Sequence, residues 1–554
     1  MPGETWLGLL GAVLIGTVVA WAVLGPGPLS VTNVAWLSRF DDVQHQVGWM
    51  FYRSSPWTWP PGANPAFGLE IGSSIFYSDS IPLLAIPLKA AASALPESFQ
   101  YFGPWLWACL LLQAAFGWLL MGLASDQPAL RVLGAGFFAV SPVMLRRVTD
   151  AVGGHHSLVA QWLVLAALLL CLAPPRRSRA LPWIALGVVS AWVHPYLAAM
   201  VMGLWAADLA ARVIGEKPRW IPVVKECAGV LGALSGALWL AGAFMLRGGL
   251  GSEGFGRYRM NVLALVSPDG WSRLLPDLPG TSEECAGFSY LGLGGLLLLA
   301  VAGGLALSAK RRWRLSRRYW PLAALCGLFT AFALSPYIGI GGSEVSLPFA
   351  SWLDSAGAIF RVSGRMFWPV YYLLLWLALR TVSRRLPATV AVTGLALLLA
   401  LQVWDTSVAW PLIRKKLALE GPRIETRLKS AFWRVAATHY RRVRLFPAEN
   451  HSARWRVISL FAAERGLDTD ATYLARIDPQ RVEQLNEKTR ADLAHGTWEP
   501  GTLYVLRGRA WSLVGRTRDS RRDLLADVDG MTVLAPGWKT CTECQAGTGW
   551  RELP

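Results

Sequence analysis

Long apolar stretches recur through the first three quarters of this chain, and they constrain its fold more than any other feature. An α-helix needs about 20 predominantly apolar residues to cross the hydrocarbon core of a bilayer. Stretches of this kind cover residues 6–24, 105–124, 130–148, 157–173, 228–246, 288–308, 319–335, 366–382 and 387–404. We therefore predict a mainly α-helical protein that crosses a membrane repeatedly.

The composition agrees with this prediction. Only 16% of the residues are charged and the mean hydropathy is +0.37, whereas soluble proteins carry about 25% charged residues. The net charge of +17 is typical of a membrane protein whose cytoplasmic loops are basic and contact anionic headgroups. No nucleic-acid-binding motif accompanies the charge, so we exclude nucleic acid as a partner.

Short basic loops predict the topology. Residues 174–182, 310–318 and 380–387 are rich in arginine and are expected on the cytoplasmic side, and the basic stretch 207–226 shares that side. The first apolar stretch lacks a basic start and a cleavage site, so it is interpreted as a retained span. Residues 183–213 then have to cross an even number of times, although they are too short for two full spans. The break at His194-Pro195 predicts two short helices that meet on the outer side.

The segment 77–96 is interrupted by Pro82 and Pro87 and is predicted to be interfacial or re-entrant. The total is about eleven crossings within a transmembrane domain of residues 1–404. This domain includes a long first outer loop at residues 26–104, and loops of that length are usually functional.

Residues 405–554 form a tail that this count places on the outer face. Strand-like runs at 441–447, 501–508 and 530–537 alternate with helical stretches at 454–466 and 479–496, which predicts a small soluble α/β domain. Cys541 and Cys544 have a suggestive spacing, but no histidine stands near them in the sequence. A disulfide or a free thiol pair is therefore favoured over a zinc site.

Acidic and aromatic residues collect in the first outer loop. Asp41 and Asp42 follow the first span. They are interpreted either as an N-terminal helix cap or a solvated interfacial pair, or as a pair in which one carboxylate is a general base. Predicted substrate-binding residues on the same outer side are His45, Trp57, Trp59, Asp79, His155 and His156. The tryptophans either stack on a sugar or belong to an interfacial belt. No carboxylate or thiolate at ligand spacing completes a site with the two adjacent histidines, so no metal ligand is assigned, and a divalent cofactor stays open.

Basic residues on the outer side oppose the positive-inside trend. Arg361 and Arg365 precede a span, and if this segment is helical their spacing places both guanidinium groups on one face. They either reach toward the headgroups or bind phosphate, for which paired arginines are well suited. Gly364 between them favours close approach of another backbone. His194 is either a helix-turn residue or a further contact to phosphate or substrate.

Two resemblances extend this interpretation. The acidic pair soon after the first span, in a long outer loop, resembles the C-type glycosyltransferase superfamily (GT-C), and "DSIPLLAIPLK" (79–89) is similar to a proline-leucine element of its mannosyltransferases and aminoarabinose transferases. It departs from their basic-Pro-Pro-Leu form. The segments "GLEIGSSIFYSDSIPLLA", "FRVSGRMFWPVYY", "HPYLAAMVMGLWAADL" and "GFSYLGLGGLLLL" also resemble an uncharacterised family of bacterial multispan membrane proteins.

The GT-C resemblance implies a glycosyltransferase of the bacterial inner membrane that acts on the periplasmic side and inverts the anomeric carbon. The donor would be a polyprenyl-phosphate sugar, and the acceptor an envelope glycan, lipid or protein. Asp41 or Asp42 would be the base, and Arg361, Arg365 and His194 would hold the donor phosphate. A transporter or flippase of lipid-linked saccharides and a non-catalytic subunit of an envelope-polysaccharide system are the alternatives. A transporter requires charges buried within the spans and symmetry between halves.

Overall fold

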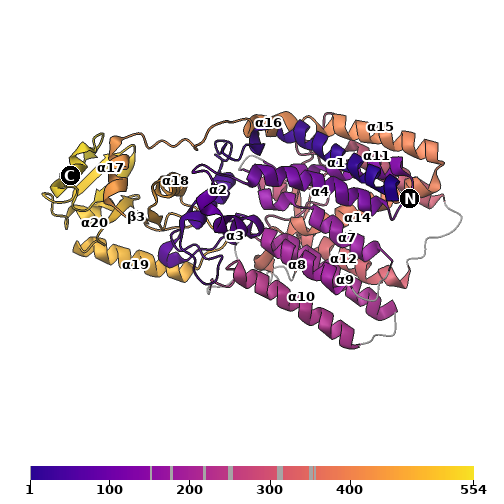
Figure 1. Cartoon of the computed structure of the whole chain (residues 1–554), viewed down its shortest axis with the longest axis horizontal. Helices are drawn as coiled ribbons and strands as arrows, with labels where there is room; N and C mark the ends of the chain where they lie inside the picture. Colours follow the sequence, from indigo (N-terminus) through magenta and orange to yellow (C-terminus); the bar gives the residue numbers. More distant parts are fainter. Residues whose placement is uncertain are drawn as a thin grey trace. The chain divides into compact units, whose positions relative to one another are not determined.

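The chain is mainly helical, with 58% of the residues that the structure describes in helices. In the computed structural model (Figure 1), the described residues are 2–149, 153–174, 179–215, 220–246, 254–308, 316–348, 354 and 357–553. They form two compact units. Unit 1 comprises residues 1–36, 100–237 and 251–420, and unit 2 comprises residues 37–99, 238–250 and 421–554.

Apolar helices build unit 1, and several of them run along a common direction (Figure 1). They are α1 (Pro2–Leu24), α4 (Phe102–Met121), α5 (Pro128–Ala139), α6 (Pro142–Leu145), α7 (Trp162–Leu172), α8 (Ala180–Val193), α9 (Pro195–Gly215), α10 (Trp220–Leu240), α11 (Leu293–Leu307), α12 (Trp320–Leu334), α14 (Trp368–Arg385), α15 (Ala388–Thr406) and α16 (Trp410–Leu417). The end of α10 belongs to unit 2. Helix α4 packs against α1, α5 and α7, while α9 packs against α7, α8 and α12.

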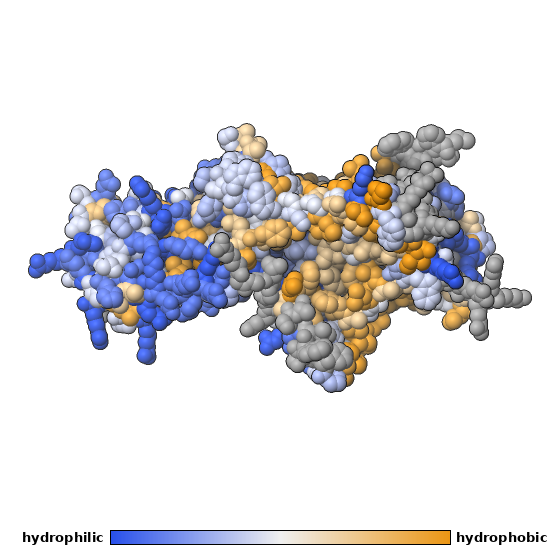
Figure 2. Space-filling view, turned by 90° about the horizontal axis from the view of Figure 1, so that it is seen from below, coloured by the Kyte–Doolittle hydropathy of each residue, from blue (hydrophilic) through white to orange (hydrophobic). Residues whose placement is uncertain are grey.

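Six helices of the described chain are long and apolar enough to cross a membrane, fewer than the eleven predicted. They cover Phe102–Met121, Pro128–Leu145, Pro195–Gly215, Trp220–Leu240, Ser363–Arg385 and Ala388–Thr406, while other apolar helices such as α8 and α11 are shorter. The face of unit 1 visible in Figure 2 is largely hydrophobic. On α1, Leu10, Leu14, Val18 and Trp21 are all more than half exposed, as expected for a helix that faces lipid. The structure is thus consistent with membrane association.

The chain between residues 180 and 240 differs partly from the prediction. A helix break does occur at His194-Pro195, where α8 ends and α9 begins. Helix α9 is not short, however, because its 21 residues continue to Gly215. Helix α10 begins at Trp220, earlier than the predicted start at residue 228. The proline-interrupted segment forms the short helix α3 (Pro82–Ala90), which has 9 residues and is followed by a 3₁₀ turn at Ala92–Ala94. A helix of this length cannot cross a bilayer.

The tail in unit 2 forms a six-stranded sheet in the order β4-β3-β5-β7-β6-β8. The strands are β3 (Arg442–Phe446), β4 (Asp468–Thr469), β5 (Thr502–Leu506), β6 (Leu524–Val528), β7 (Met531–Ala535) and β8 (Arg551–Glu552). Strand β3 pairs in parallel with β4 and β5, and the remaining pairs are antiparallel. Its helices are α17 (Ala431–His439), α18 (Trp455–Arg465), α19 (Pro479–His495) and α20 (Trp511–Gly515). The predicted small α/β region is confirmed, including β3, β5, β7, α18 and α19.

The first long loop packs with the tail rather than standing apart from it. The Gly68 amide donates to the Thr469 carbonyl at 2.7 Å, and the Thr469 amide donates to the Ala66 carbonyl at 3.0 Å. The loop therefore extends the sheet beyond its edge strand β4. Helix α2 (Phe40–Ser54) packs against α18. The predicted division at residue 404 grouped this loop with the transmembrane domain, whereas it shares unit 2 with the tail.

A single arginine joins the loop to the sheet. Arg444 on β3 has a side chain only 2% exposed, and it forms ion pairs with Glu70 of the loop (2.7 Å), Asp470 (3.2 Å) and Glu499 (3.0 Å). Burial raises the pKa of Asp470 to about 6 even though Arg444 opposes that rise. Burial also disfavours ionised Glu70, but hydrogen bonds from Arg444 lower its pKa overall. Arg444 thus compensates three carboxylates at the point where the loop meets the sheet.

Candidate functional site

His194 stands at the junction of two helices at one end of the unit 1 bundle. Its amide donates to the Ser190 carbonyl at 2.9 Å and completes α8, and its carbonyl accepts from the Ala198 amide at 3.0 Å in the first turn of α9. Pro195 occupies the first helical position, where its fixed φ is favourable and its missing N–H costs nothing. The sequence therefore forces a break that leaves the imidazole between two helices.

The hydrogen bond that His194 accepts defines its tautomer. Its Nδ1 accepts from the Tyr196 amide at 3.1 Å, so in the neutral ring the proton is assigned to Nε2. The side chain is buried, with 6% of its surface exposed. His194 therefore presents an N–H donor on the side of the ring away from Tyr196.

Tyr196 links His194 to the arginine segment. The Arg365 guanidinium lies 5.2 Å from the centre of the Tyr196 ring, and the His194 ring lies 5.5 Å from it. The Tyr196 hydroxyl accepts a hydrogen bond from the Val362 amide at 2.8 Å. Two of the three predicted phosphate-binding residues are therefore brought together around one aromatic side chain, and no sequence motif marks that tyrosine.

The segment with the two arginines is not one α-helix. Two short 3₁₀ turns, Ala358–Phe360 and Ser363–Phe367, are separated by Arg361 and Val362, so the condition for stacking both guanidinium groups on one face of an α-helix is not met. Arg361 instead lies over Tyr258 at 5.7 Å. Arg365 is only 7% exposed, which argues against a side chain that reaches out to headgroups.

Gly364 is required by close packing, as the sequence suggested. A Cβ at this position would lie 2.5 Å from the Gly287 Cα and 2.9 Å from the Arg259 carbonyl carbon. The Gly364 amide donates to the Tyr258 carbonyl at 3.2 Å. Backbone contact with residues 258–260 therefore fixes the position of the Arg365 backbone. It thereby helps to hold the Arg365 guanidinium close to the Tyr196 ring.

Arg259, beside this segment, has a structural role. It forms ion pairs with Glu284 at 2.9 Å and Glu344 at 2.7 Å, and Glu284 also accepts from Asn261 at 2.8 Å. These contacts tie the loop after α10 to the hairpin of β1 (Tyr337–Ile340) and β2 (Ser343–Ser346). The charge of Arg259 is thus already compensated.

Asp41 and Asp42 occupy the first turn of α2 in unit 2. Negative charge is favourable there because the helix dipole is positive at its N-terminus. The two residues are only 7% and 3% exposed, so they are not a solvated pair. Neither is the helix cap, because the N-cap residue of α2 is Arg39. His45, which is 1% exposed, follows Asp41 by four residues and lies on the same helix face.

The segment around Asp79 packs directly on α2. Ser80 Oγ donates to the His45 carbonyl at 2.8 Å, and a Cβ at Gly48 would lie 2.4 Å from Ser78. Asp79 and Ile81 both have left-handed backbone conformations, with φ of 54° and 52°. Such conformations are strained for a β-branched residue and concentrate at functional sites. The structure therefore gathers Asp41, His45 and Asp79 in one region of unit 2.

The loop tryptophans have different surroundings. The Lys89 ammonium lies 4.2 Å from the centre of the Tyr52 ring and 4.7 Å from that of Trp57, and burial lowers the pKa of Lys89 to about 8. Trp59 is 78% exposed and stacks on Trp239 at 5.7 Å. Trp57 therefore covers a lysine, whereas Trp59 presents an open aromatic surface.

His155 and His156 begin the segment that leads into α7. The His156 ring is completely buried, 5.3 Å from Trp36 and 5.7 Å from Phe102, and its carbonyl accepts from Trp105 Nε1 at 3.0 Å. His155 is half-buried. These contacts make His156 a packing residue of the bundle.

Among the residues that the structure describes, the one cluster with metal-ligand geometry is His439, Cys541 and Cys544. The two cysteines form a disulfide, as one of the two favoured interpretations expected, and Cys541 Sγ lies 3.6 Å from His439 Nδ1. No sequence signal pointed to His439, because it stands about a hundred residues before the cysteines.

Four charged side chains near the ends of α8, α9 and α10 form a closed network, and three of them (Arg179, Asp208 and Glu226) are buried. Asp208 pairs with Arg179 at 2.7 Å and with Arg212 at 3.1 Å, and Arg212 pairs with Glu226 at 2.5 Å. Trp183 Nε1 donates to Asp208 at 3.0 Å. Each charge has an opposite partner, so the network stabilises the packing of these helices.

The fold and these clusters define a protein with a bundle of apolar, membrane-length helices and a second unit made of an α/β tail and a long loop. The family described as "Domain of unknown function (DUF6311)" matches residues 13–407, more than two thirds of the chain, and the "DUF6311 C-terminal domain" matches residues 432–536. The chain belongs to the DUF6311 family. No curated protein matches it.

Proposed function

We propose that this chain is an inverting membrane glycosyltransferase that transfers a sugar from a polyprenyl-phosphate donor to an envelope glycan, lipid or protein. The observation that carries the proposal is the cluster around Tyr196, in which His194 and Arg365 converge and Arg361 lies close in sequence. A phosphate is the ligand that guanidinium groups and an imidazole N–H bind best together.

The cluster is suited to stabilising a leaving phosphate. In the proposed reaction, the acceptor oxygen forms a bond to the anomeric carbon while the bond from that carbon to the donor phosphate oxygen breaks. Negative charge then grows on the phosphate, where fixed donors such as Arg365 and the His194 Nε2–H lower the barrier. The packing at Gly364 holds these donors in place before the reaction.

The acceptor hydroxyl needs a base, and Asp41 or Asp42 is the proposed one. The carboxylate would take the hydroxyl proton as the oxygen attacks. Asp41 shares a helix face with the buried His45, and Asp42 lies one residue further along the first turn. The exposed face of Trp59 offers a surface on which a sugar ring stacks.

We also infer a topology of eleven crossings, with unit 2 on the periplasmic side of a bacterial inner membrane. Unit 2 contains the first loop, the end of α10 and the tail. If these three segments lie on one side of the membrane, the chain has to cross it an even number of times between each of them and the next. The order of elements fits this condition: α4, α5 with α6, α7, α8, α9 and α10 precede the second segment, and α11, α12, α14 and α15 precede the third. Helix α1 adds the first crossing.

A binding experiment tests the phosphate cluster. The purified full-length chain in nanodiscs is titrated with a polyprenyl phosphate, and affinity is compared among the wild type, Arg365→Gln and Arg257→Gln. Arg257 is exposed on the same loop region as Tyr258 and serves as the control. We expect at least tenfold weaker binding for Arg365→Gln, about 1.4 kcal/mol, and unchanged binding for Arg257→Gln. Equal affinities for all three proteins would refute the phosphate role.

A separate experiment tests the base. Asp41→Asn and Asp42→Asn are introduced singly and together into cells that lack the chromosomal copy, and envelope glycans are analysed by mass spectrometry. We expect one single variant to abolish the modification while the protein stays folded. If the double variant retains full modification, the catalytic proposal is wrong.

A further inference from the structure

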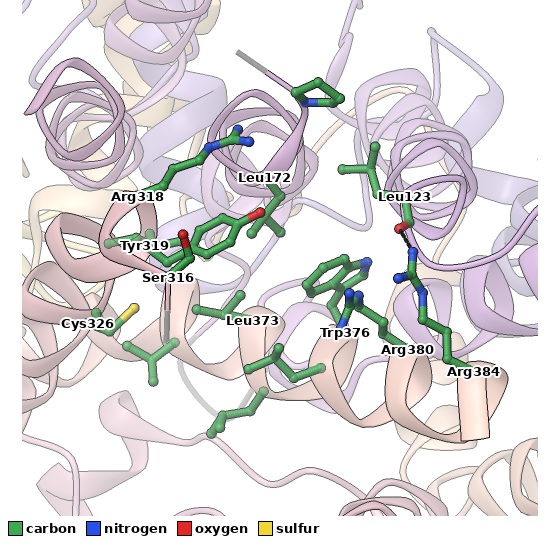
Figure 3. Close-up of a pocket in the computed structure, with 16 residues that line it drawn as sticks. Leu123, Leu172, Ser316, Arg318, Tyr319, Cys326, Leu373, Trp376, Arg380 and Arg384 are labelled. Carbon is green, nitrogen blue, oxygen red and sulfur yellow. Dashed lines mark hydrogen bonds between the residues drawn. The ribbon is translucent and has the colours of Figure 1, made fainter. Parts of the chain in front are cut away.

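A cavity opens at the end of the bundle where α4, α7 and α14 terminate and α12 begins (Figure 3). Its volume is about 760 Å³, which lies within the range of cavities that hold small ligands. All of its lining residues belong to unit 1. The three short basic loops predicted from the sequence to be cytoplasmic lie next to it in the chain.

The wall of the cavity is mostly aliphatic. Leu172 of α7, Leu322 of α12 and Leu373 and Leu377 of α14 line it, together with the indole of Trp376. Figure 3 shows Leu373 and Trp376 on the helix that also carries Arg380 and Arg384, with Tyr319 and Arg318 on the other side. A ligand that fills this cavity therefore needs an apolar part.

Three arginines stand at the same cavity. Arg384 donates to the Ala124 carbonyl at 3.0 Å and to the Leu123 carbonyl at 3.1 Å, and Arg318 donates to the Ala173 carbonyl. These bonds orient both side chains and leave other N–H donors of each guanidinium available, since each has five. Arg380 lies over Trp376 at 5.7 Å.

The lining of the cavity carries three arginines and no acidic residue. Within the described residues, no carboxylate forms an ion pair with Arg318, Arg380 or Arg384. The adjoining loop sequences 174–182, 309–318 and 380–387 contain neither aspartate nor glutamate. Arg384 is exposed and Arg318 and Arg380 are half-buried, so an anion that enters the cavity can contact their guanidinium groups and reduce the repulsion between the three like charges.

We propose that this cavity binds an anionic phospholipid, with one acyl chain against the leucines and the phosphate on Arg318, Arg380 and Arg384. The site goes beyond the proposed transferase site. Arg365 lies before the start of α14 and Arg384 at its end, and the 18 residues of that helix span about 27 Å at 1.5 Å per residue. One phosphate cannot contact both places.

The test uses the delipidated full-length chain in detergent, probed by native mass spectrometry. Phosphatidylglycerol and phosphatidylcholine with identical acyl chains are added separately, and bound lipid is counted for the wild type, Arg380→Gln and Arg385→Gln. Arg385 is the next arginine on α14 but does not line the cavity. We expect the wild type and Arg385→Gln to retain phosphatidylglycerol at least tenfold more tightly than phosphatidylcholine, and Arg380→Gln to lose that preference.

Further measurements distinguish lipid binding from binding of a simple anion, and a specific loss of binding from misfolding of a variant. Leu373→Trp, which fills the apolar part, is expected to weaken phosphatidylglycerol binding more than fivefold, and millimolar inorganic phosphate is expected not to displace the lipid. Thermal unfolding of each variant checks its fold. Arg384→Gln is a second variant that removes a positive charge from the cavity, and it is expected to behave like Arg380→Gln. Equal retention of both lipids by the wild type, equal loss for Arg380→Gln and Arg385→Gln, or full displacement by phosphate would overturn the proposal.

Discussion

Replacing Arg444 by methionine tests how the first loop is held on the sheet. The substitution keeps much of the side-chain volume but removes all the hydrogen bonds to Glu70, Asp470 and Glu499. Asp470, which is 2% exposed, then has a buried carboxylate without its cation. Breaking a buried ion pair by removing one partner costs about 3–5 kcal/mol. We expect a loss of that size in the stability of unit 2.

Two further variants calibrate the expected loss in the stability of unit 2. Glu70→Gln keeps an acceptor and removes a charge from a side chain that is 46% exposed, so we expect a loss of about 1 kcal/mol. Arg442 lies on the same strand, is 45% exposed and pairs with acids only at 3.7 and 3.8 Å. Arg442→Met is therefore the matched control and is expected to change stability by less than about 1 kcal/mol.

Hydrogen exchange of the full-length chain measures these effects where they occur. The amides of Gly68 and Thr469 bridge the loop and the sheet, so peptides that contain them report opening of this junction. A loss of 3–5 kcal/mol corresponds to exchange that is roughly a hundredfold to a few thousandfold faster. Exchange at Gly68 that is equally fast in Arg444→Met and Arg442→Met would refute the reasoning.

The pH dependence gives a second check on the cause. The folded pKa of Asp470 already exceeds that of an ordinary aspartate, and removing Arg444 raises it further. A carboxylate with a raised folded pKa lowers stability progressively as the pH rises through that value. Arg444→Met should therefore be closer to the wild type at pH 5 than at pH 7.5. An equal deficit at both pH values would show that charge is not the reason.

Three other predictions concern single sites. Gly364→Ala should lower the free energy of unfolding by about 1–3 kcal/mol, because its Cβ would lie 2.5 Å from the Gly287 Cα. Gly394→Ala on α15 is the control, since a Cβ there has nothing within 4 Å, and it should be neutral or slightly stabilising in thermal unfolding. Asp405→Ala should lower the free energy of unfolding by about 3–5 kcal/mol. Its completely buried carboxylate accepts four hydrogen bonds, from Ser272 Oγ, the Arg273 amide, the Tyr290 hydroxyl and the Leu293 amide. A loss below about 1 kcal/mol would contradict this. Lys89 has a folded pKa of about 8, below its ordinary value, so the unfolded chain binds more protons between about pH 8 and 10.5. Across that range the wild type should gain about 3 kcal/mol of stability relative to Lys89→Met. Parallel stability curves for the two proteins would exclude this titration.

Long runs with one periodicity were the most predictable parts of the fold. The strands β3, β5 and β7 and the helices α18 and α19 follow from alternating or helical patterns bounded by turn residues. The start of α10 could not be predicted because Lys225 and Glu226 were interpreted as loop residues. In the structure, Arg212 neutralises Glu226 and Trp205 hydrogen-bonds to it at 3.2 Å, so a helix can bury that charge.

The candidate sites were predictable as residue types but not as clusters. His194, Arg361 and Arg365 stood out because polar residues are rare in such sequences. The tyrosines that position them gave no such signal, because Tyr196 and Tyr258 are common interfacial residues and are separated from the arginines by at least a hundred positions. Glu70 and Arg444 are 374 positions apart, and only the folded chain shows that they form one ion pair.

That separation has a consequence for biosynthesis. Unit 2 is discontinuous, so its first segment leaves the ribosome long before the strand that receives it. At about 5–20 residues per second, the 374 residues between Glu70 and Arg444 take roughly 20 to 75 s to synthesise. During this interval the carboxylate of Glu70 lacks the cation that pairs with it in the folded unit. The folding of unit 2 is therefore complete only after the strand that carries Arg444 has been synthesised, although the loop that carries Glu70 is made much earlier.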